Sequence, residues 1–392
     1  KKAANDMDSR FVFVILVLTT ITKIYADDAC GGLSYYGPQG YGWNDKIQMG
    51  TADEGDYRMY FYWPARTNGS GAEYDPSGAP YPVISFAHGF ASPDMEYLSY
   101  LEHFSSWGYF AVAPNSRNAY KGQIEEYNQD IHQVIEWLKT QNSDPTSWLY
   151  QQVDVTSIGI VGHSMGAVAT TMASFQPYID PGLRAIVPIA GSAEQLDLIH
   201  NITVPTHLIT GTADKLMPPA TTNFAYANMQ IPKIHSQIIG GWHCGFMDIS
   251  VLLPDEKCRP EAGWMDRDTQ LMLTRCLMMP FLHLYLKNLD YSDLVWGPGI
   301  FGYDMVNVTT HPWVRVEPQH HHKQAALGSN IAFHAKLTNS GLASSSFTVR
   351  VAESSSMITV SPTTTPVLAP GDTALVTIIL SLQSAGGDSA TL

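Results

Sequence analysis

The sequence predicts an α/β protein in which a mostly parallel sheet carries helices on both faces and a small all-β domain follows. Short apolar runs alternate with amphipathic helical patterns up to about residue 290, as in sheets built from βαβ units. A Gly-x-Ser-x-Gly turn joins one apolar run to a run of small residues at 167–173. From His311 onward the chain is rich in Ser, Thr and Pro and has no helical period.

The apolar runs give seven strands. These predicted strands are 58–63, which Pro64 is expected to end, 82–87, 109–113, 157–161, 185–189, 207–211 and 234–239. Apolar residues spaced by three and four predict helices at 95–107, 123–139 and 268–286, and 167–173 also reads as a helix. Right-handed crossovers place the loops after the strands along one edge of the sheet, where a site is expected.

Residues 1–26 have the pattern of a secretory signal peptide. Basic residues precede the apolar run 11–18, and Ala26 offers a small residue for cleavage. The run is shorter than the roughly 20 residues that cross a bilayer, so an uncleaved anchor is the less favoured alternative. We therefore expect a secreted, extracellular protein with no stable membrane span.

Composition and charge exclude several classes of function. The formal net charge is −14, and an acidic surface repels phosphate backbones, so no nucleic-acid partner is expected. No Gly-x-Gly-x-x-Gly follows a predicted strand, which argues against a dinucleotide cofactor. The histidines at 320–322 have no acidic or cysteine partner at ligand spacing, so we interpret them as solvated and expect neither metal nor cofactor.

An even number of cysteines in a secreted chain suggests up to two disulfides, with three possible connectivities. The four are Cys30, Cys244, Cys258 and Cys276. The last three crowd into one region, so Cys244–Cys258 or Cys258–Cys276 is expected. Asn-x-Ser/Thr triplets at Asn68, Asn201 and Asn307 are candidate glycosylation acceptors.

The Gly-x-Ser-x-Gly turn, called the nucleophile elbow, is built from Gly162, Ser164 and Gly166. Such a turn is strained and closely packed, which calls for glycines on both sides of the serine. It lifts the serine hydroxyl out of the sheet edge and points the positive end of the next helix at it. Ser164 is therefore the candidate nucleophile.

A serine hydroxyl needs a base that is oriented by a third group. Asp214 follows the strand 207–211, and His243 lies in the loop after the strand 234–239. Both loops lie on the same edge as Ser164 if the sheet is parallel. His243 would take the serine proton, and Asp214 would hold the imidazole tautomer.

Rival residues fit this site less well. Asp180, Asp197 and Asp248 do not follow a strand as cleanly as Asp214 does. His163 lies inside the turn and is expected to be buried packing, whereas His235 begins its strand and so lies at the wrong edge.

The tetrahedral oxyanion of acyl transfer needs two backbone N–H donors. Met165 directly follows the nucleophile, and Phe90 lies in the loop after the strand 82–87, so their N–H groups are the candidates. Gly89 lets the backbone approach the substrate, and His88 and Gly89 are expected to contribute to substrate binding together with Trp242.

These segments together resemble the α/β-hydrolase superfamily. They are 88–90 (His-Gly-Phe), 162–166 (Gly-His-Ser-Met-Gly), 211–214 (Gly-Thr-Ala-Asp) and 241–243 (Gly-Trp-His). The likeness covers about residues 55–290 and is greatest to the branch of chlorophyllases, cutinase-like polyester hydrolases and platelet-activating-factor acetylhydrolases. It implies the Ser164–Asp214–His243 triad, with Phe90 and Met165 lining the acyl pocket.

Two departures limit what the resemblance implies. Polyester hydrolases carry an aromatic residue shortly after the strand that follows the elbow helix, whereas 188–192 here reads Pro-Ile-Ala-Gly-Ser. The usual second glycine after the elbow is replaced here by Ala167.

The stretch between strands 185–189 and 207–211 is too short for a large cap, so we expect an open cleft for a bulky, polymeric or interfacial ester.

The C-terminal part resembles an immunoglobulin-like sandwich of the kind appended to secreted hydrolases. Segments 331–338, 347–351 and 375–379 alternate like half-buried strands, and a turn at 369–372 leads into the last. The part is short for such a sandwich, so we expect it to be incomplete. The expected domains are the signal peptide 1–26, a hydrolase domain 27–310 and an accessory domain 311–392.

The sequence therefore predicts a secreted serine carboxylester hydrolase that acts through an acyl-enzyme on lipid, chlorophyll-type or polyester substrates. Two alternatives remain open. One is a serine peptidase or thioesterase with the same fold, and the other is a catalytically inactive hydrolase-fold binding protein.

Overall fold

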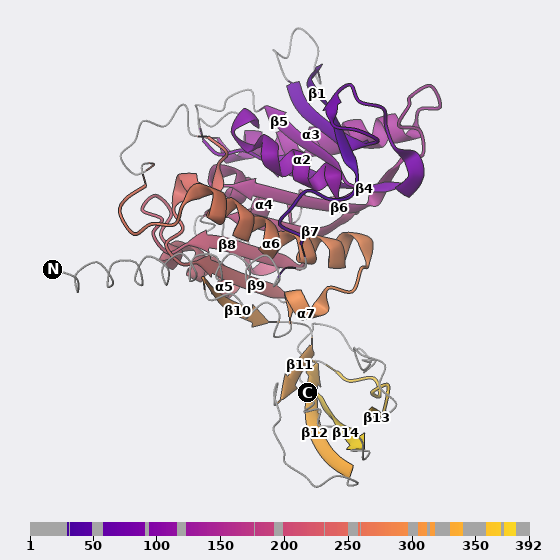
Figure 1. The fold of residues 1–392 in the computed structure, drawn as a ribbon, viewed down its shortest axis with the longest axis vertical. Helices are drawn as coiled ribbons and strands as arrows, with labels where there is room; N and C mark the ends of the chain where they lie inside the picture. Colours follow the sequence, from indigo (N-terminus) through magenta and orange to yellow (C-terminus); the bar gives the residue numbers. More distant parts are fainter. Residues whose placement is uncertain are drawn as a thin grey trace, which may run out of the picture. The chain divides into compact units, whose positions relative to one another are not determined.

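The chain forms two compact units, residues 1–310 and 311–392. The computed structural model describes residues 30, 32–48, 58–90, 94–115, 123–175, 177–191, 199–230, 232–249, 258, 260–296, 305–311, 314–317, 330–339, 358–369 and 372–381 (Figure 1). The predicted signal peptide, the histidines at 320–322 and the predicted strand 347–351 lie outside these residues.

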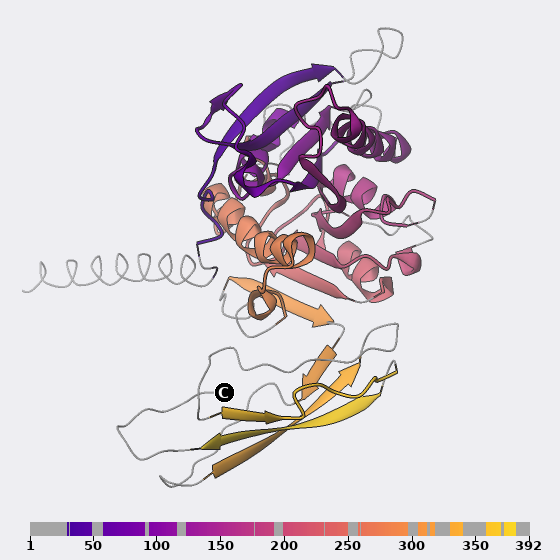
Figure 2. The same ribbon diagram turned by 90° about the vertical axis from the view of Figure 1, so that its right-hand side faces the viewer.

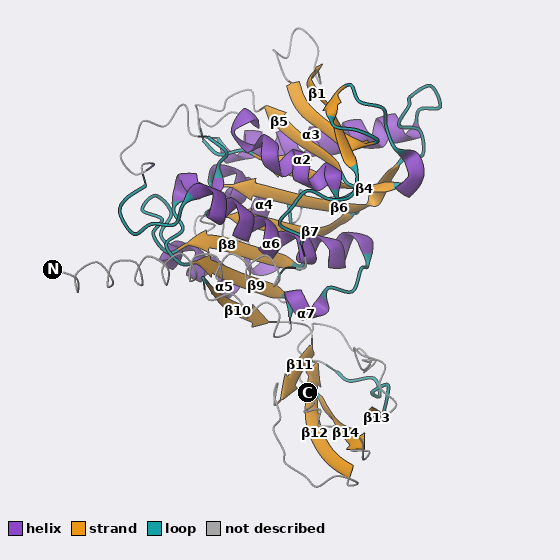
Figure 3. Cartoon of the chain, in the orientation of Figure 1, coloured by secondary structure: helices purple, strands orange, loops and turns teal. Residues whose placement is uncertain are grey.

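The first unit is organised around a ten-stranded sheet with the order β10-β9-β8-β7-β6-β4-β5-β2-β1-β3 (Figure 3). The strands are β1 (Gly40–Gln48), β2 (Arg58–Ala65), β3 (Gly69–Ser70), β4 (Tyr81–Ala87), β5 (Phe110–Asn115), β6 (Val153–His163), β7 (Leu183–Ile189), β8 (Thr206–Gly211), β9 (Lys233–Ile238) and β10 (Val306–His311). In the sheet order from β9 to β5, which includes β4, each strand pairs in parallel with its neighbour. In contrast, β2 pairs antiparallel with both β5 and β1. The predicted α/β class is confirmed.

Helices cover both faces of this sheet. They are α2 (Leu98–Ser106), α3 (Ile124–Ser143), α4 (Met165–Met172), α5 (Pro219–Asn228), α6 (Arg267–Lys287) and α7 (Ser292–Val295). α2 and α6 lie on one face, and α3, α4 and α5 lie on the other (Figure 2). Ile160 and Val161 are neighbours in β6 but belong to different apolar clusters, one on each face, because successive strand side chains point to opposite sides.

The expectation that Pro64 ends its strand is wrong. β2 continues to Ala65, and Pro64 pairs with Tyr41 of β1. Proline is tolerated there because the register with β5 stops at Tyr62. On that open side the Pro64 carbonyl accepts a hydrogen bond from the N–H of Asp75 at 3.0 Å, which does not require an N–H on proline.

Two disulfides join the cysteines of the first unit. Cys244–Cys258 is one of the two expected pairs, but Cys258–Cys276 is wrong, because Cys276 of α6 is bonded to Cys30. These two partners are 246 residues apart in the sequence, and the fold rather than the spacing brings them together. Among the described residues, no helix has both the length and the apolar character that crossing a membrane requires.

The described strands of the second unit form one antiparallel sheet. They are β11 (Val314–Glu317), β12 (Asn330–Asn339), β13 (Ile358–Ser361) and β14 (Thr373–Ser381), in the order β11-β12-β14-β13. In β12 the side chains of Phe333 and Leu337 are buried, whereas those of His334 and Lys336 are exposed. This alternation is that of a half-buried strand. An immunoglobulin-like sandwich remains a prediction.

Buried histidines should make the fold sensitive to acid. Burial lowers the pKa of His207 and His283 to about 3 and the pKa of His235 to about 4. Below pH 6.5 the unfolded chain therefore binds protons that the native state does not. Each such histidine lowers the free energy of unfolding by about 1.4 kcal/mol per pH unit. We expect the urea midpoint to fall steeply from pH 6.5 to pH 4.5, and less steeply in His235→Gln. A constant midpoint over that range would contradict this.

Candidate active site

The turn between β6 and α4 places one serine in a strained conformation at the edge of the sheet. Ser164 lies between the last residue of β6 and the first residue of α4, and its φ is +57°. A Cβ on Gly162 would lie 2.3 Å from the carbonyl oxygen of Gly166, and one on Gly166 would lie 2.1 Å from that of Ala87. Only glycine fits at these two positions, which explains the spacing found in the sequence.

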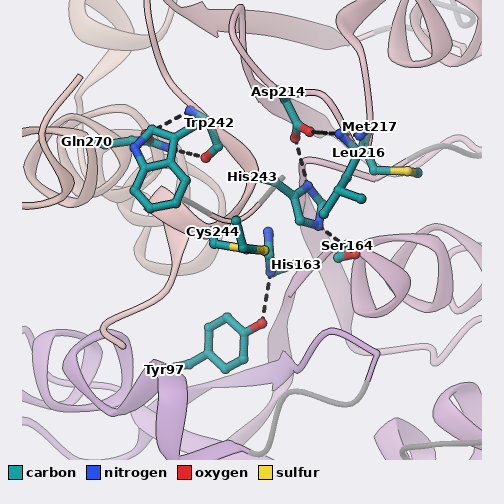
Figure 4. Close-up of a disulfide and its surroundings, with 11 residues drawn as sticks. Tyr97, His163, Ser164, Asp214, Leu216, Met217, Trp242, His243, Cys244 and Gln270 are labelled. Atoms are coloured by element: carbon teal, nitrogen blue, oxygen red, sulfur yellow. Dashed lines mark hydrogen bonds and ion pairs between the residues drawn. A yellow bond between two sulfur atoms is a disulfide. The ribbon is translucent and has the colours of Figure 1, made fainter. Parts of the chain in front are cut away.

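The three side chains singled out from the sequence meet at this edge (Figure 4). The hydroxyl of Ser164 lies 2.9 Å from His243 Nε2, and His243 Nδ1 lies 2.8 Å from Asp214 Oδ2. A carboxylate can only accept, so Nδ1 carries the hydrogen and Nε2 is left to accept from the serine. His243 and Asp214 are almost completely buried.

The loop after β8 fixes the orientation of the Asp214 carboxylate. Its Oδ1 accepts hydrogen bonds from the backbone N–H groups of Leu216 at 2.9 Å and Met217 at 2.7 Å. Oδ2 is thereby directed at His243. A Cβ on Gly211 would lie 2.3 Å from the carbonyl oxygen of Gly241, so the loops after β8 and β9 touch through their backbones. This close approach brings the acid to the histidine.

The loop that carries His243 is held from behind by a residue of α6. The side chain of Gln270 is fully buried, accepts from the N–H of Trp242 at 3.0 Å and donates to its carbonyl at 2.8 Å. The Cys244–Cys258 disulfide begins at the next residue after His243 (Figure 4). Sequence reasoning missed Gln270, because no motif connects it to a loop 28 residues away.

The expectation that Trp242 lines the cleft is wrong. Its side chain is only 1% exposed, and its indole N–H donates to the carbonyl of Met265 at 3.0 Å. His243 points to Ser164, whereas the indole of the preceding residue packs into the core and hydrogen-bonds there. Trp242 therefore supports the loop from inside.

A second histidine lies directly behind His243. The ring of His163 is 1% exposed, and its centroid is 4.7 Å from that of His243. The hydroxyl of Tyr97 lies 2.8 Å from His163 Nδ1 (Figure 4). Burial, reinforced by His243, holds the pKa of His163 well below its usual range, so the ring is neutral. No positive charge at His163 therefore opposes charge that develops on His243.

The loop after β4 lies against the start of α4. A Cβ on Gly166 would also meet the carbonyl oxygen of His88 at 2.5 Å, so this loop and the elbow are in backbone contact. The loop continues to Phe90, whose side chain is 40% exposed, while Met165 is half-buried. The side chain of His88 is fully buried, which contradicts the expectation that it contacts substrate.

The rival residues have other partners. Asp180 accepts from the N–H of Gly182 and pairs with Lys139, and Asp248 accepts from the N–H of Ser99 at the start of α2. The His235 Nε2 atom lies 2.9 Å from the Thr210 hydroxyl. Asp197 is outside the described residues, within which no group of three or more His, Cys, Asp or Glu side chains could hold a metal ion.

Comparison with known families agrees with this geometry. Residues 60–247 match the profile of a family described as PET hydrolase-like. Residues 60–247 form a PET hydrolase-like domain of the α/β-hydrolase superfamily. A search of curated proteins finds no match.

The PET hydrolase-like domain contains all three residues of the hydrogen-bonded chain as well as Phe90 and Met165. The match ends before α6, although α6 covers one face of the same sheet and supplies Gln270. The PET hydrolase-like family of this domain implies a hydrolase of the esterase type.

Proposed function

We propose that the protein is a secreted serine carboxylester hydrolase that works through an acyl-enzyme. One observation carries the proposal: two hydrogen bonds join Asp214, His243 and Ser164 in that order, at the strained turn of a PET hydrolase-like domain. A nucleophile bonded to a base, which is bonded in turn to an orienting acid, is the signature of covalent acyl transfer.

In the first step the oxygen of Ser164 attacks the ester carbonyl and its proton passes to Nε2 of His243. Asp214 stabilises the imidazolium through Nδ1–H. The carbonyl oxygen becomes an oxyanion, which accepts hydrogen bonds from the backbone N–H groups of Phe90 and Met165. The imidazolium then gives its proton to the leaving alkoxide. Water repeats the sequence on the acyl-enzyme and releases the acid.

The surface around this edge favours a bulky, polymeric or interfacial ester. Phe90, Ile239 and Ile249 follow β4 and β9 and are 40%, 44% and 43% exposed. Large apolar side chains exposed after the strands that also lead into the loops of the site suit contact with a lipid or polymer surface. The connection from β7 to β8 spans only residues 190–205, which supports the proposal of a site without a large cap.

Secretion is supported by the two disulfides, because such bonds persist in oxidising compartments. The signal-like residues 1–26 are consistent with this. The second unit, 311–392, is proposed as an accessory module for substrate or surface attachment.

The test combines a fluorophosphonate probe with a series of p-nitrophenyl esters from acetyl to palmitoyl. We expect the wild type to gain the mass of one phosphonyl group at Ser164 and to hydrolyse part of the series, and Ser164→Ala to do neither. A preference for short chains would indicate a cutinase-like or acetylhydrolase role, and long chains a lipase or chlorophyllase role. Labelling without ester hydrolysis would favour a peptidase or thioesterase, and a folded wild type that does not label would favour an inactive binding protein.

A further inference from the structure

Three buried side chains converge on the backbone of Gly89, the residue before the proposed oxyanion donor. The carbonyl oxygen of Gly89 accepts hydrogen bonds from His88 Nδ1 at 2.8 Å and from the hydroxyl of Tyr127 at 3.4 Å. Its N–H donates to the hydroxyl of Tyr97 at 3.2 Å. His88, Tyr97 and Tyr127 are each at most 2% exposed.

The carbonyl of Gly89 and the N–H of Phe90 belong to one peptide group. In a trans peptide these two groups point in opposite directions within one plane. Anchoring the Gly89 oxygen on the core side therefore fixes the direction of the Phe90 N–H on the other side. Donation to a carbonyl also polarises the amide, which strengthens its N–H as a donor.

The preceding peptide group is fixed as well. The Tyr97 hydroxyl that accepts from the N–H of Gly89 also lies 2.8 Å from His163 Nδ1, and the ring of His163 packs against His243. A Cβ on Gly89 would lie 3.0 Å from this hydroxyl and 3.4 Å from the Cβ of Ser164. The backbone at Gly89 therefore lies close to the nucleophile, and a side chain at this position would be crowded by the Tyr97 hydroxyl.

We propose that His88 and Tyr127 are positioning residues for the oxyanion hole: their hydrogen bonds to the Gly89 oxygen aim the Phe90 N–H at the tetrahedral oxyanion on Ser164, while Tyr97 holds the adjacent peptide. This inference rests on the proposed serine hydrolase function. It gives His88 a role through the backbone in place of the substrate contact expected from the sequence. It also accounts for Tyr127, a residue that no sequence motif singled out.

The test uses variants that remove or keep a donor to the Gly89 oxygen. His88→Leu removes it, and His88→Asn keeps an N–H near the position of Nδ1. Tyr127→Phe removes one hydroxyl without changing the shape of the ring. Tyr109→Phe is the matched control, since its buried hydroxyl bonds His283 away from this loop.

The measurement is the rate constant for phosphonylation by a fluorophosphonate, together with kcat and KM for p-nitrophenyl butyrate. In phosphonylation the Ser164 oxygen bonds to phosphorus, fluoride leaves, the proton passes to His243, and the phosphoryl oxygen occupies the oxyanion hole. Losing a whole oxyanion donor costs about 10²- to 10³-fold, so misdirecting one should cost less.

We expect His88→Leu to lower both the phosphonylation rate and kcat by about 10- to 100-fold at nearly constant KM. His88→Asn should recover most of the loss, Tyr127→Phe should lose a few fold, and Tyr109→Phe should behave like the wild type. Rates equal to the wild type in folded His88→Leu and Tyr127→Phe would overturn the inference, as would a rise in KM at unchanged kcat.

Two further outcomes, an unfolded variant and an unreactive wild type, can be told apart from a failure of this inference alone. If His88→Leu does not fold, Tyr127→Phe decides alone, because it leaves the packing unchanged. A wild type that neither labels nor hydrolyses any ester overturns the proposed function and this inference with it, whereas a reactive wild type with equally reactive variants overturns only the inference.

Discussion

Replacing Ser164 by alanine is expected to lower kcat for ester hydrolysis by about 10⁵- to 10⁶-fold, and replacing His243 by alanine should cost about as much. The hydroxyl and Nε2 are 2.9 Å apart, so the base acts on the proton of this one nucleophile. Without the base the serine is a weak nucleophile, and without the serine the base has no proton to accept. The double variant should therefore be no slower than either single variant.

The comparison needs controls outside the site. Ser143→Ala and His200→Ala change exposed residues of α3 and of a short helical turn at Ile199–Asn201, and both should keep the activity of the wild type. Steady-state rates with p-nitrophenyl butyrate give the comparison. If Ser164→Ala retained more than about a hundredth of the activity, or if the two losses added in the double variant, these residues would not act as one unit.

The parts of the fold that follow local rules could be predicted from the sequence. Several interior strands of the parallel sheet contain a short apolar run, such as 158–161 in β6 and 185–189 in β7, because both faces of the sheet are covered. The positions of Asp214 and His243 could also be predicted, because the loops after parallel strands lie along one edge of the sheet. The structure places both side chains within hydrogen-bond distance of their partners.

Features that depend on tertiary contacts could not be predicted in this way. Residues 30–43 read as an irregular stretch rich in Gly and Tyr, yet the strand β1 begins within it at Gly40 and pairs with β2 along most of its length. Cys30 has no nearby partner in the sequence and reaches Cys276 only when α6 lies on the sheet. Gln270 is an ordinary polar residue on a helix until its amide is seen to hold Trp242.

The direction of a side chain in a loop was the other source of error. Trp242 and His88 stand next to residues at the reactive edge, and proximity in the sequence suggested that they contact substrate. Both side chains instead point into the core, where they hydrogen-bond to backbone carbonyls. A loop has no fixed period, so nothing in the sequence indicates which of two neighbours faces the cleft.

Replacing Asp214 by asparagine is expected to lower kcat by about 10⁴-fold while the protein remains folded. The backbone N–H groups of Leu216 and Met217 both donate to Oδ1, so the amide oxygen of asparagine should keep this place. The NH₂ group then falls where Oδ2 was and donates to His243 Nδ1. That bond imposes the tautomer with hydrogen on Nε2, which cannot accept the proton of Ser164.

Asp154→Asn is the matched control for this variant. Its Oδ1 also accepts from a backbone N–H two residues later, that of Thr156 at 3.0 Å, but it lies at the start of β6, away from the reactive edge. It should keep the wild-type rate. The ring ¹⁵N chemical shifts of His243 should show hydrogen on Nδ1 in the wild type and on Nε2 in Asp214→Asn. A variant that kept kcat within tenfold of the wild type, with the Nε2 tautomer present, would show that catalysis does not depend on the tautomer that Asp214 sets.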